Sequence, residues 1–293
     1  MSREENKEIF QDTEKLCKTN PLLIQAWKSS SKLQKLILEN EAVAFEKQIY
    51  EKSANIIVSK KRSFEASMGY EGKNVAVLNF ASASNPGGGV VNGSSAQEES
   101  LCRCSTLYYN LTEDFMWKNF YIPHRRAANP IHNDDLIYTP NVVIFKSDTN
   151  YPRLLPENEW KKVNVITCAA PNLRERPSNA FNSGDGNSTA KISDDELEQI
   201  HIKRGRKILE TAAANKNEVV ILGAFGCGAF MNNPEVVARA YKKLIEEFKY
   251  TFETIEFAIY CSPRDDSNFR IFNVIMNGKI SVCLLLKKYI KKS

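Results

Sequence analysis

The sequence contains no long hydrophobic run and no hydrophobic leader at its start. No apolar stretch reaches the roughly 18 residues that a membrane-spanning helix needs. The opening residues, MSREENKEIFQD, are charged and lack the apolar core of a signal peptide. We therefore expect neither a membrane anchor nor secretion. The sequence predicts a cytoplasmic location, or a nuclear one if the chain is eukaryotic.

Histidine is scarce, and the cysteines follow no pattern. The three histidines, His124, His132 and His201, are too isolated in the sequence to suggest a metal site. Seven cysteines occur at irregular spacings, and Cys102 and Cys104 have no second pair at zinc-finger spacing. An odd, irregular set of cysteines indicates free thiols in a reducing compartment rather than a disulfide framework. The sequence therefore predicts no metal and no cofactor.

Size and charge exclude little. The chain has 293 residues, of which 26% are charged, and a net charge of +5. This length allows one large domain or two small ones, and it suffices to bury a full core without disulfides. The mild positive charge permits a polyanionic partner, but it is too small to argue for one.

The beginning of the chain, to about residue 40, is helical in character. Apolar positions recur at helical spacing in EIFQDTEKLCK, and the segments LLIQAW and KLQKLIL continue the pattern. We expect residues 1–50 to form a helical extension that packs on a catalytic domain of residues 51–293.

Five short apolar runs, rich in valine and isoleucine, follow this region. They barely alternate with polar residues, which is typical of central strands covered on both faces. The runs span residues 75–80, 142–145, 163–169, 219–224 and 255–260. Residues 55–58 are a further candidate strand, and residues 63–67 could begin a helix.

Two helices between the later runs have clear start signals. Ser193-Asp-Asp-Glu196 is a capping box that opens a helix through about Ala214. Asn233-Pro234 supplies an N-cap and a first-turn proline for a second helix through about Phe248. Strands that alternate with helices and are covered on both faces predict a three-layer α/β/α sandwich. The pattern of residues 280–290 fits a strand or a helix.

Two glycine-rich turns each follow a predicted strand directly. They are Asn85-Pro-Gly-Gly-Gly89 and Gly223-Ala-Phe-Gly-Cys-Gly228. Glycine adopts positive φ and allows backbone N–H groups to approach a ligand closely, so the two turns could flank one diphosphate. The alternative is that each is a tight turn without a ligand. Neither turn fits the dinucleotide-binding or P-loop motifs.

Two adjacent glutamates, Glu98 and Glu99, come shortly after the first glycine-rich turn. Neighbours on a helix point about 100° apart, so these two cannot form the opposed pair of an ordinary glycosidase. If both enter one site, they must contact different atoms of the substrate. They could instead be a solvated first helical turn, where acids suit the helix dipole. Their position after the turn favours a place in the same cleft.

The combination of the glycines and the glutamates resembles a known family. The run VLNFASASNPGGG, seven residues and then QEE resembles the signature of poly(ADP-ribose) glycohydrolases, and SLCRCSTLY looks like their microbial-type branch. The blocks VITCAAPN and VILGAFGCGAFMNNP fit the same branch. The resemblance implies a macrodomain-like α/β/α fold with a mixed central sheet.

The resemblance also implies a role for each matching residue. Glu99 would protonate the leaving oxygen of the ribose–ribose bond and then activate water, and Glu98 would hydrogen-bond ribose hydroxyls. A raised pKa, from burial and the neighbouring carboxylate, would suit that acid. The expected substrate-binding residues are Asn85, Gly87, Gly88 and Gly89 in the first turn, Gln97 in the catalytic loop, Gly226, Cys227 and Gly228 in the diphosphate loop, and Phe230 on the distal ribose.

The implied function is a poly(ADP-ribose) glycohydrolase that releases ADP-ribose mainly from the chain end, because Phe230 would close over the distal ribose. The expected partners are poly(ADP-ribose) or ADP-ribosylated macromolecules, and we expect a monomer. The alternatives are a hydrolase of single ADP-ribose units on protein or nucleic acid, and a non-catalytic macrodomain that binds ADP-ribose. The glutamates argue against the last, since a binding module needs no acid.

Three segments are less clearly matched. Cys104 occupies a position where the branch is expected to have arginine or another polar residue. The loop of residues 172–192 is longer and more polar than usual for the branch. Residues 134–139 match the region that shapes the adenosine end of the site.

Overall fold

The computed structural model describes residues 1–179 and 183–278, and its centre is a seven-stranded mixed sheet. The strand order is β1-β4-β5-β3-β6-β7-β2. β5, β3, β6, β7 and β2 are parallel neighbours, whereas β4 runs antiparallel to both β5 and β1. The carboxyl ends of the parallel strands therefore meet at one edge of the sheet, which is where ligands bind in such sheets.

The elements have the following bounds. The strands are β1 Lys35–Ile37, β2 Asn55–Ser59, β3 Val75–Phe80, β4 Leu136–Ile144, β5 Lys161–Cys168, β6 Val219–Leu222 and β7 Thr254–Ala258. The helices are α1 Arg3–Thr19, α2 Pro21–Ser31, α3 Ser63–Met68, α4 Gln97–Cys104, α5 Leu107–Leu111, α6 Asp114–Met116, α7 Ile122–Ala127, α8 Asp194–Ala214, α9 Pro234–Phe248 and α10 Ser267–Asn277. Short turns η1 Val90–Asn92, η2 Trp117–Tyr121 and η3 Glu157–Glu159 complete the list.

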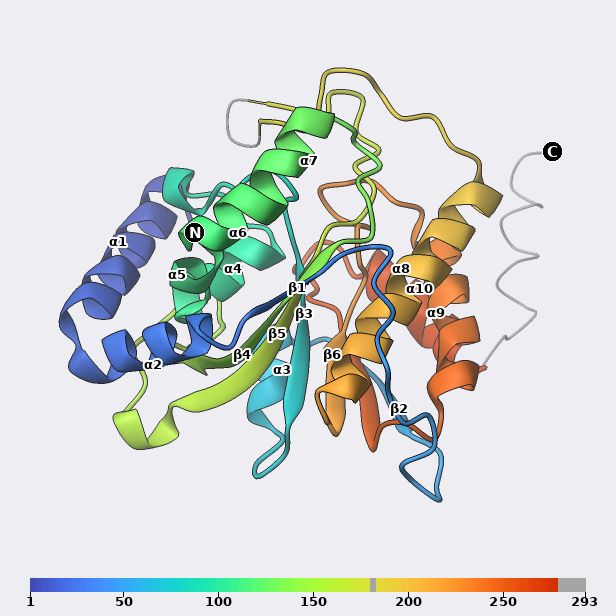
Figure 1. The fold of residues 1–293 in the computed structure, drawn as a ribbon, viewed down its shortest axis with the longest axis horizontal. Helices are drawn as coiled ribbons and strands as arrows, with labels where there is room; N and C mark the ends of the chain where they lie inside the picture. Colours follow the sequence, from blue (N-terminus) through green and yellow to red (C-terminus); the bar gives the residue numbers. More distant parts are fainter. Residues whose placement is uncertain (180–182, 279–293) are drawn as a thin grey trace.

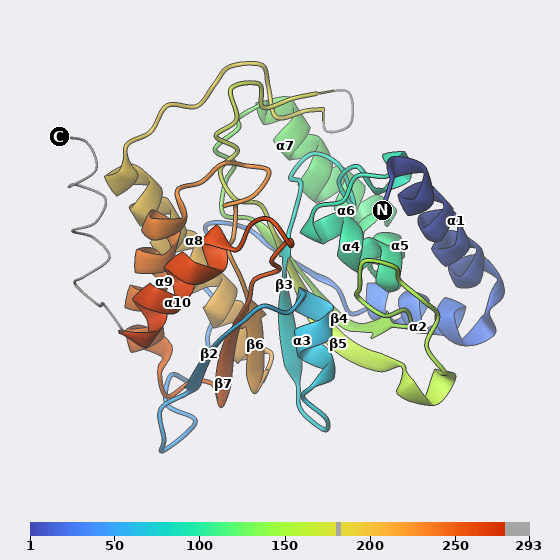
Figure 2. The same cartoon turned by 180° about the vertical axis from the view of Figure 1, so that it is seen from behind.

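Helices cover both faces of the sheet, so the predicted three-layer α/β/α sandwich with a mixed sheet is confirmed (Figures 1 and 2). α8, α9 and α10 lie on one face, and α1 to α6 lie on the other. Strand β3 packs against helices on both faces of the sheet. Ala76 and Leu78 belong to the core shared with α8, α9 and α10, and Val75 and Val77 belong to the core on the opposite face. A strand buried on both faces needs this continuous apolar run.

The start signals read from the sequence are present in the structure. Ser193 caps α8 and forms the predicted box with Glu196, and the Asn233 side chain accepts a hydrogen bond from the N–H of Glu235 at the start of α9. Residues 55–58 lie in β2, and α3 starts at Ser63, as expected. Residues 280–290 lie outside the described part of the chain.

The sequence prediction was wrong for residues 35–37, which form strand β1 and not a helix. Leu36 and Ile37 pair with Ile137 and Leu136 at the edge of the sheet. Pairing with a long strand outweighs the helical pattern of so short a segment. The first 50 residues thus contribute a strand as well as two helices, and the boundary at residue 50 remains a prediction.

The sequence analysis did not predict helices α5, α6, α7 and α10. In α10, Phe269, Phe272 and Met276 recur at helical spacing and pack against the core that α8 and α9 share. Within residues 1–179 and 183–278, no helix is both long and apolar enough to cross a membrane. The six cysteines in these ranges are all free.

Candidate active site

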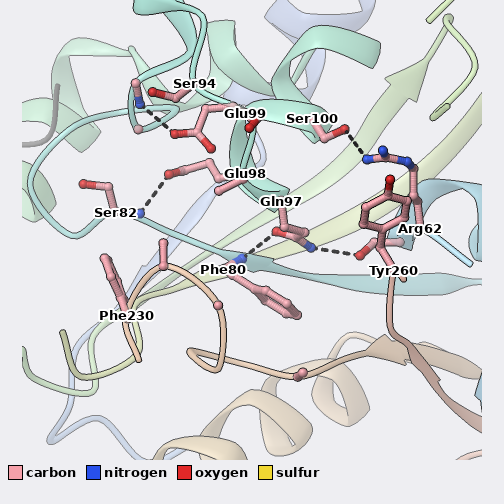
Figure 3. Close-up of a pocket in the computed structure, with 18 of the residues that line it drawn as sticks. Arg62, Phe80, Ser82, Ser94, Gln97, Glu98, Glu99, Ser100, Phe230 and Tyr260 are labelled. Atoms are coloured by element: carbon pink, nitrogen blue, oxygen red, sulfur yellow. Dashed lines mark hydrogen bonds between the residues drawn. The ribbon is translucent and has the colours of Figure 1, made fainter. Parts of the chain in front are cut away.

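A cavity of about 660 Å³ lies at the carboxyl ends of β2, β3, β6 and β7 (Figure 3). Eight of the residues predicted for the site line it, namely Gly88, Gly89, Gln97, Glu98, Glu99, Gly226, Gly228 and Phe230. Asn85, Gly87 and Cys227 are not among the lining residues. Most of the predicted site residues therefore lie in one cavity, although they come from segments more than 100 residues apart.

Glu98 is held by the protein at both carboxylate oxygens. The side chain is 2% exposed and comes from the first turn of α4. The backbone N–H of Ser82 donates to Oε2 at 2.8 Å, and Nδ2 of Asn79 donates to Oε1 at 3.1 Å. These contacts fix the Glu98 carboxyl against the end of β3. A carboxylate has further lone pairs, so it can still accept a ribose hydroxyl.

Glu99 has one oxygen held and one without a protein partner. The backbone N–H of Gly89 donates to Oε1 at 2.9 Å. Oε2 is buried and forms no hydrogen bond with any residue that the structure describes. Because Glu99 lines the cavity, this oxygen is the one best able to exchange a proton with a bound substrate.

Burial raises the pKa of both carboxyls. The pKa of Glu98 rises to about 8, first because of burial and then because of the nearby charge of Glu99, although the Ser82 N–H and Asn79 act to lower it. Burial also raises the pKa of Glu99, against the Gly89 N–H and Arg103, which lower it. This agrees with the expectation of a buried acid beside a second carboxylate, because the charge of each glutamate opposes ionisation of the other. Two such close groups titrate as a pair.

Gln97 connects α4 to the sheet with both ends of its amide. Its Oε1 accepts from the N–H of Phe80 at 2.9 Å, and its Nε2 donates to Ser63 Oγ at 3.0 Å and Leu78 O at 2.8 Å. The side chain that was predicted to bind substrate therefore also fixes the start of the glutamate helix.

The first glycine-rich turn holds the glutamates. Gly88 has φ +58°, and a Cβ there would lie 2.5 Å from Oε1 of Glu99, so only glycine allows the carboxylate this close. The N–H of Gly88 donates to Asn85 O, and that of Gly89 is used by Glu99. Gly87 packs against Tyr108, outside the cavity.

The glycines of the second turn that line the cavity, Gly226 and Gly228, have backbone donors that the protein does not use: in the described part of the chain, their N–H groups donate to no protein atom. Gly226 has φ +78°, and a Cβ there would lie 2.7 Å from Ala170 Cβ, whereas a Cβ on Gly228 would meet nothing within 4 Å. This turn therefore has the geometry for an anion.

The comparisons with known proteins agree with this geometry. A family model described as the catalytic domain of microbial-type PARG, or poly(ADP-ribose) glycohydrolase, matches residues 5–147. The poly(ADP-ribose) glycohydrolase of Deinococcus radiodurans, solved in complex with ADP-ribose, is 30% identical with a TM-score of 0.71, and the match covers 88% of this chain and 98% of that chain. The chain belongs to the microbial-type PARG family.

The enzyme of Thermomonospora curvata is also similar to this chain. It is 26% identical with a TM-score of 0.79, and the match covers 93% of this chain and 99% of that chain. A second structure of that enzyme, bound to the inhibitor ADP-HPD, gives 26% identity, a TM-score of 0.74, and coverage of 91% and 97%. None of the curated proteins matches the chain. PARG enzymes are glycosidases that act on poly(ADP-ribose), so the chain has the architecture of an O-glycosyl hydrolase.

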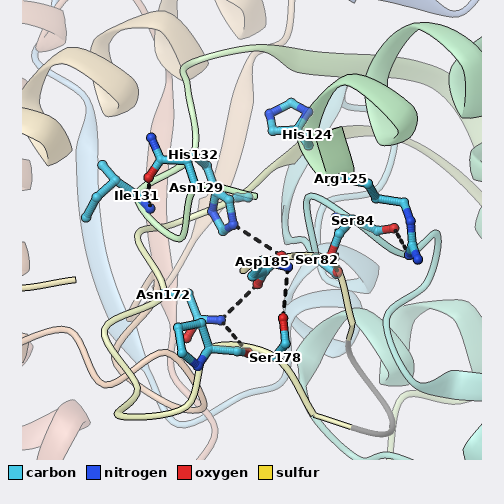
Figure 4. Close-up of polar contacts among 12 residues, drawn as sticks. Ser82, Ser84, His124, Arg125, Asn129, Ile131, His132, Asn172, Ser178 and Asp185 are labelled. Atoms are coloured by element: carbon cyan, nitrogen blue, oxygen red, sulfur yellow. Dashed lines mark hydrogen bonds and ion pairs between the residues drawn. The ribbon is translucent and has the colours of Figure 1, made fainter. Parts of the chain in front are cut away.

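Asn85 serves to attach a loop to the first glycine-rich turn. Its Oδ1 accepts from Arg125 at 2.9 Å, and its Nδ2 donates to Ser183 O at 2.7 Å. Beside it, the buried Asp185 accepts from Ser84 Oγ at 2.7 Å and faces His132 Nε2 at 3.5 Å (Figure 4). Residues 183–185, in the loop predicted to be long and polar, are therefore attached to the first glycine-rich turn.

The sequence analysis missed the end of the cavity opposite Phe230. There the guanidinium of Arg62 stacks on the ring of Tyr260, 3.9 Å from its centroid (Figure 3), and Asp148 also lines the cavity. Arg62 follows β2 and Tyr260 follows β7. The rule that ligands bind at the carboxyl ends of parallel strands, applied to these two strands, could have found both.

Residues 134–139 were predicted to shape the adenosine end of the site, and this remains a prediction. None of these residues is in the cavity wall. The carboxylate of Asp134 instead pairs with Arg204 at 2.8 Å and with Lys203 at 2.6 Å, and residues 136–139 belong to β4.

Across the ranges that the structure describes, no three His, Cys, Asp or Glu side chains gather where they could hold a metal ion. His124 and His132 are bonded to the carbonyls of Phe120 and Ala170, and His201 to Asn232. That the reaction needs no metal remains a prediction.

Proposed function

We propose that the protein hydrolyses the ribose–ribose O-glycosidic bond of poly(ADP-ribose), mainly at the chain end, and releases ADP-ribose. The observation that carries this proposal is the partnerless Oε2 of Glu99, which is buried in a cavity between two glycine-rich turns. The family supports it, and relatives have been solved with ADP-ribose and with ADP-HPD.

The proposed mechanism uses the two glutamates differently. Protonated Glu99 gives its proton to the leaving oxygen while the bond at the anomeric carbon breaks through an oxocarbenium-like state. The Glu99 carboxylate then takes a proton from the attacking water, so the acid is regenerated. Glu98, fixed by Ser82 and Asn79, holds a ribose hydroxyl and thereby orients the sugar.

The substrate fits the cavity in one direction. Glu98, Glu99 and Phe230 lie at one end, and the Arg62–Tyr260 stack lies at the other (Figure 3). We place the distal ribose at the glutamates and the adenosine at Tyr260, whose ring offers a stacking surface for the base. Gly226 and Gly228 line the same cavity, and their N–H groups, which have no protein acceptor in the described part of the chain, suit the diphosphate.

The proposed diphosphate contact can be tested by substituting Gly226 and Gly228. Gly226→Val is expected to strain the backbone, because φ is +78° and Ala170 is too close. Gly228→Val puts its side chain into open cavity space without that strain, so ADP-ribose binding should weaken by about tenfold or more, roughly 1.4 kcal/mol, at an unchanged Tm. Calorimetric titration and thermal unfolding measure the two effects.

The matched control is Gly69→Val, at an exposed helix cap with no positive φ. It adds the same side chain far from the cavity and should bind ADP-ribose like the parent. Unchanged affinity in Gly228→Val would show that the diphosphate does not use this turn.

We propose that the adenosine end of the cavity determines the preference for a terminal unit over an internal unit of the polymer. A terminal unit and an internal unit of the polymer differ at the 2′ hydroxyl of the adenosine ribose, which carries the next sugar in an internal unit. The Phe230 end, from which the preference was predicted, contacts the sugar that is the same in both. The Arg62–Tyr260 end is therefore where an internal unit would be rejected.

The assay is cleavage of end-labelled poly(ADP-ribose), with products sized at early times. Free ADP-ribose from the first time point supports the proposal, and long fragments with little free ADP-ribose contradict the chain-end mode. Protein carrying one ADP-ribose unit is assayed in parallel, since release from it alone would indicate a single-unit hydrolase, and binding without cleavage a reader. Activity that a chelator abolishes and a divalent ion restores would contradict the metal-free mechanism.

Two further properties belong to the proposal. We also propose that the protein is a monomer. The free cysteines of the described ranges suit a reducing, cytoplasmic location.

A further inference from the structure

The segment of residues 93–96 connects the first glycine-rich turn to the glutamate helix. It has no regular structure and follows η1, while Glu98 and Glu99 are in the first turn of α4. Before this segment in the chain lies Gly89, whose N–H donates a hydrogen bond to Glu99. The position of this segment therefore sets how the turn and the glutamates face each other.

Helix α1 contacts this segment directly. Nδ2 of Asn6, a side chain that is 2% exposed, donates to Gly93 O at 3.0 Å. Gly93 has φ +75°, and a Cβ there would overlap Arg3 O, so the backbone of α1 lies directly against it. Arg3 and Asn6 also line the cavity that contains Glu98 and Glu99.

Helix α4 is hydrogen-bonded both to this segment and to α1. Nη1 of the buried Arg103 donates to Ser94 O at 2.5 Å. Thr13 of α1 donates through Oγ1 to Arg103 O at 2.6 Å. Lys146, also buried, donates to Thr13 Oγ1 at 2.8 Å and Ile9 O at 3.1 Å. These buried bonds fix α1 relative to α4, and hence fix Asn6 relative to Glu99.

We infer that Asn6 is a positioning residue for catalysis, which holds Gly93 so that Glu99 remains at Gly89 and faces the scissile bond. This inference rests on the proposed function. Without the Asn6 donor, the carbonyl of Gly93 loses its buried partner and the segment is free to shift. The segment leads into the helix of Glu99 and is separate from the diphosphate turn, so we expect the loss to fall far more on turnover than on affinity.

The test is Asn6→Leu, which keeps a similar volume and removes the donor. A displacement of about 1 Å at a catalytic group can cost about 100-fold in rate. We expect kcat to fall about 10- to 100-fold, while KM and the Kd for ADP-ribose stay within about threefold. Each kcat is normalised to the fraction of protein that binds ADP-ribose, so that partial unfolding does not imitate the effect.

Two further variants keep the inference falsifiable. Asn6→Ala removes the donor without adding bulk, and it should show the same loss in kcat if leucine prevents folding. Gln11→Leu makes a matched change at an exposed position of α1 and should leave all constants as in the parent. Unchanged normalised kcat in both Asn6 variants, or a loss carried by KM, would overturn the inference. A parent protein that binds ADP-ribose but cleaves no polymer would overturn the proposed function instead.

Discussion

Glu99→Gln is expected to lose turnover by about 10²–10⁴-fold or more, the contribution typical of a general acid–base group. The amide cannot give or take the proton that the leaving oxygen and the attacking water require. It can still accept the Gly89 N–H through its oxygen, so the first turn should keep its shape. The Kd for ADP-ribose should therefore remain close to that of the parent, measured by calorimetry beside steady-state kinetics.

The matched control is Glu8→Gln, an exposed acid-to-amide change on α1 without an ion pair among the described residues. It should have the activity of the parent. If Glu99→Gln keeps its turnover, Glu99 is not the acid. If it loses ADP-ribose binding in proportion to turnover, the residue acts in binding and not in proton transfer.

The sequence placed the glutamates and the first glycine-rich turn together correctly, because this part of the cavity is encoded in local motifs. The triple glycine and Gln97-Glu98-Glu99 lie within 13 consecutive residues, 87–99, and the strand before them is a continuous apolar run. The contacts among them follow from this proximity, as in the bond from the Gly89 N–H to Glu99.

The rest of the site depends on contacts between distant segments, which no local pattern records. Tyr260 meets Arg62 across 198 residues of sequence, because β7 and β2 pair at the edge of the sheet. Asn6 reaches Gly93 only because α1 packs on α4. β1 is a strand only because β4 offers it an edge, so its three residues carry no strand signal of their own.

The first glycine-rich turn shows where motif reasoning needed the structure. Its glycines were expected to expose backbone donors to a diphosphate. In the fold, the Gly89 N–H is directed at Glu99, and the lack of a side chain on Gly88 makes room for that carboxylate. Positive φ and close approach were predicted correctly, but the group that this turn holds most closely is the protein's own Glu99 carboxyl.

Glu98→Gln is expected to lose less turnover than Glu99→Gln, about tenfold to a hundredfold, the worth of one hydrogen bond to a charged group. The change suits the fold. The oxygen of the new amide can accept the Ser82 N–H, and its nitrogen can donate to Oδ1 of Asn79, a buried atom without a partner among the described residues, once the Asn79 amide turns over. The protein should therefore remain folded and bind ADP-ribose.

Glu98→Gln should also change the pH–rate profile, and the direction of this change follows from the proton that the two glutamates share. Burial and the charge of Glu99 raise the pKa of Glu98 to about 8, so in the parent the pair keeps its last proton until about that pH. Cleavage needs this proton on Glu99, and the alkaline limb of the pH–rate profile should therefore lie near pH 8. In Glu98→Gln the neighbouring carboxylate is absent, Glu99 releases its proton more easily, and the limb should move to lower pH. An unchanged limb would mean that the pair does not share the catalytic proton. A larger loss in Glu98→Gln, beside an active Glu99→Gln, would reverse the two roles.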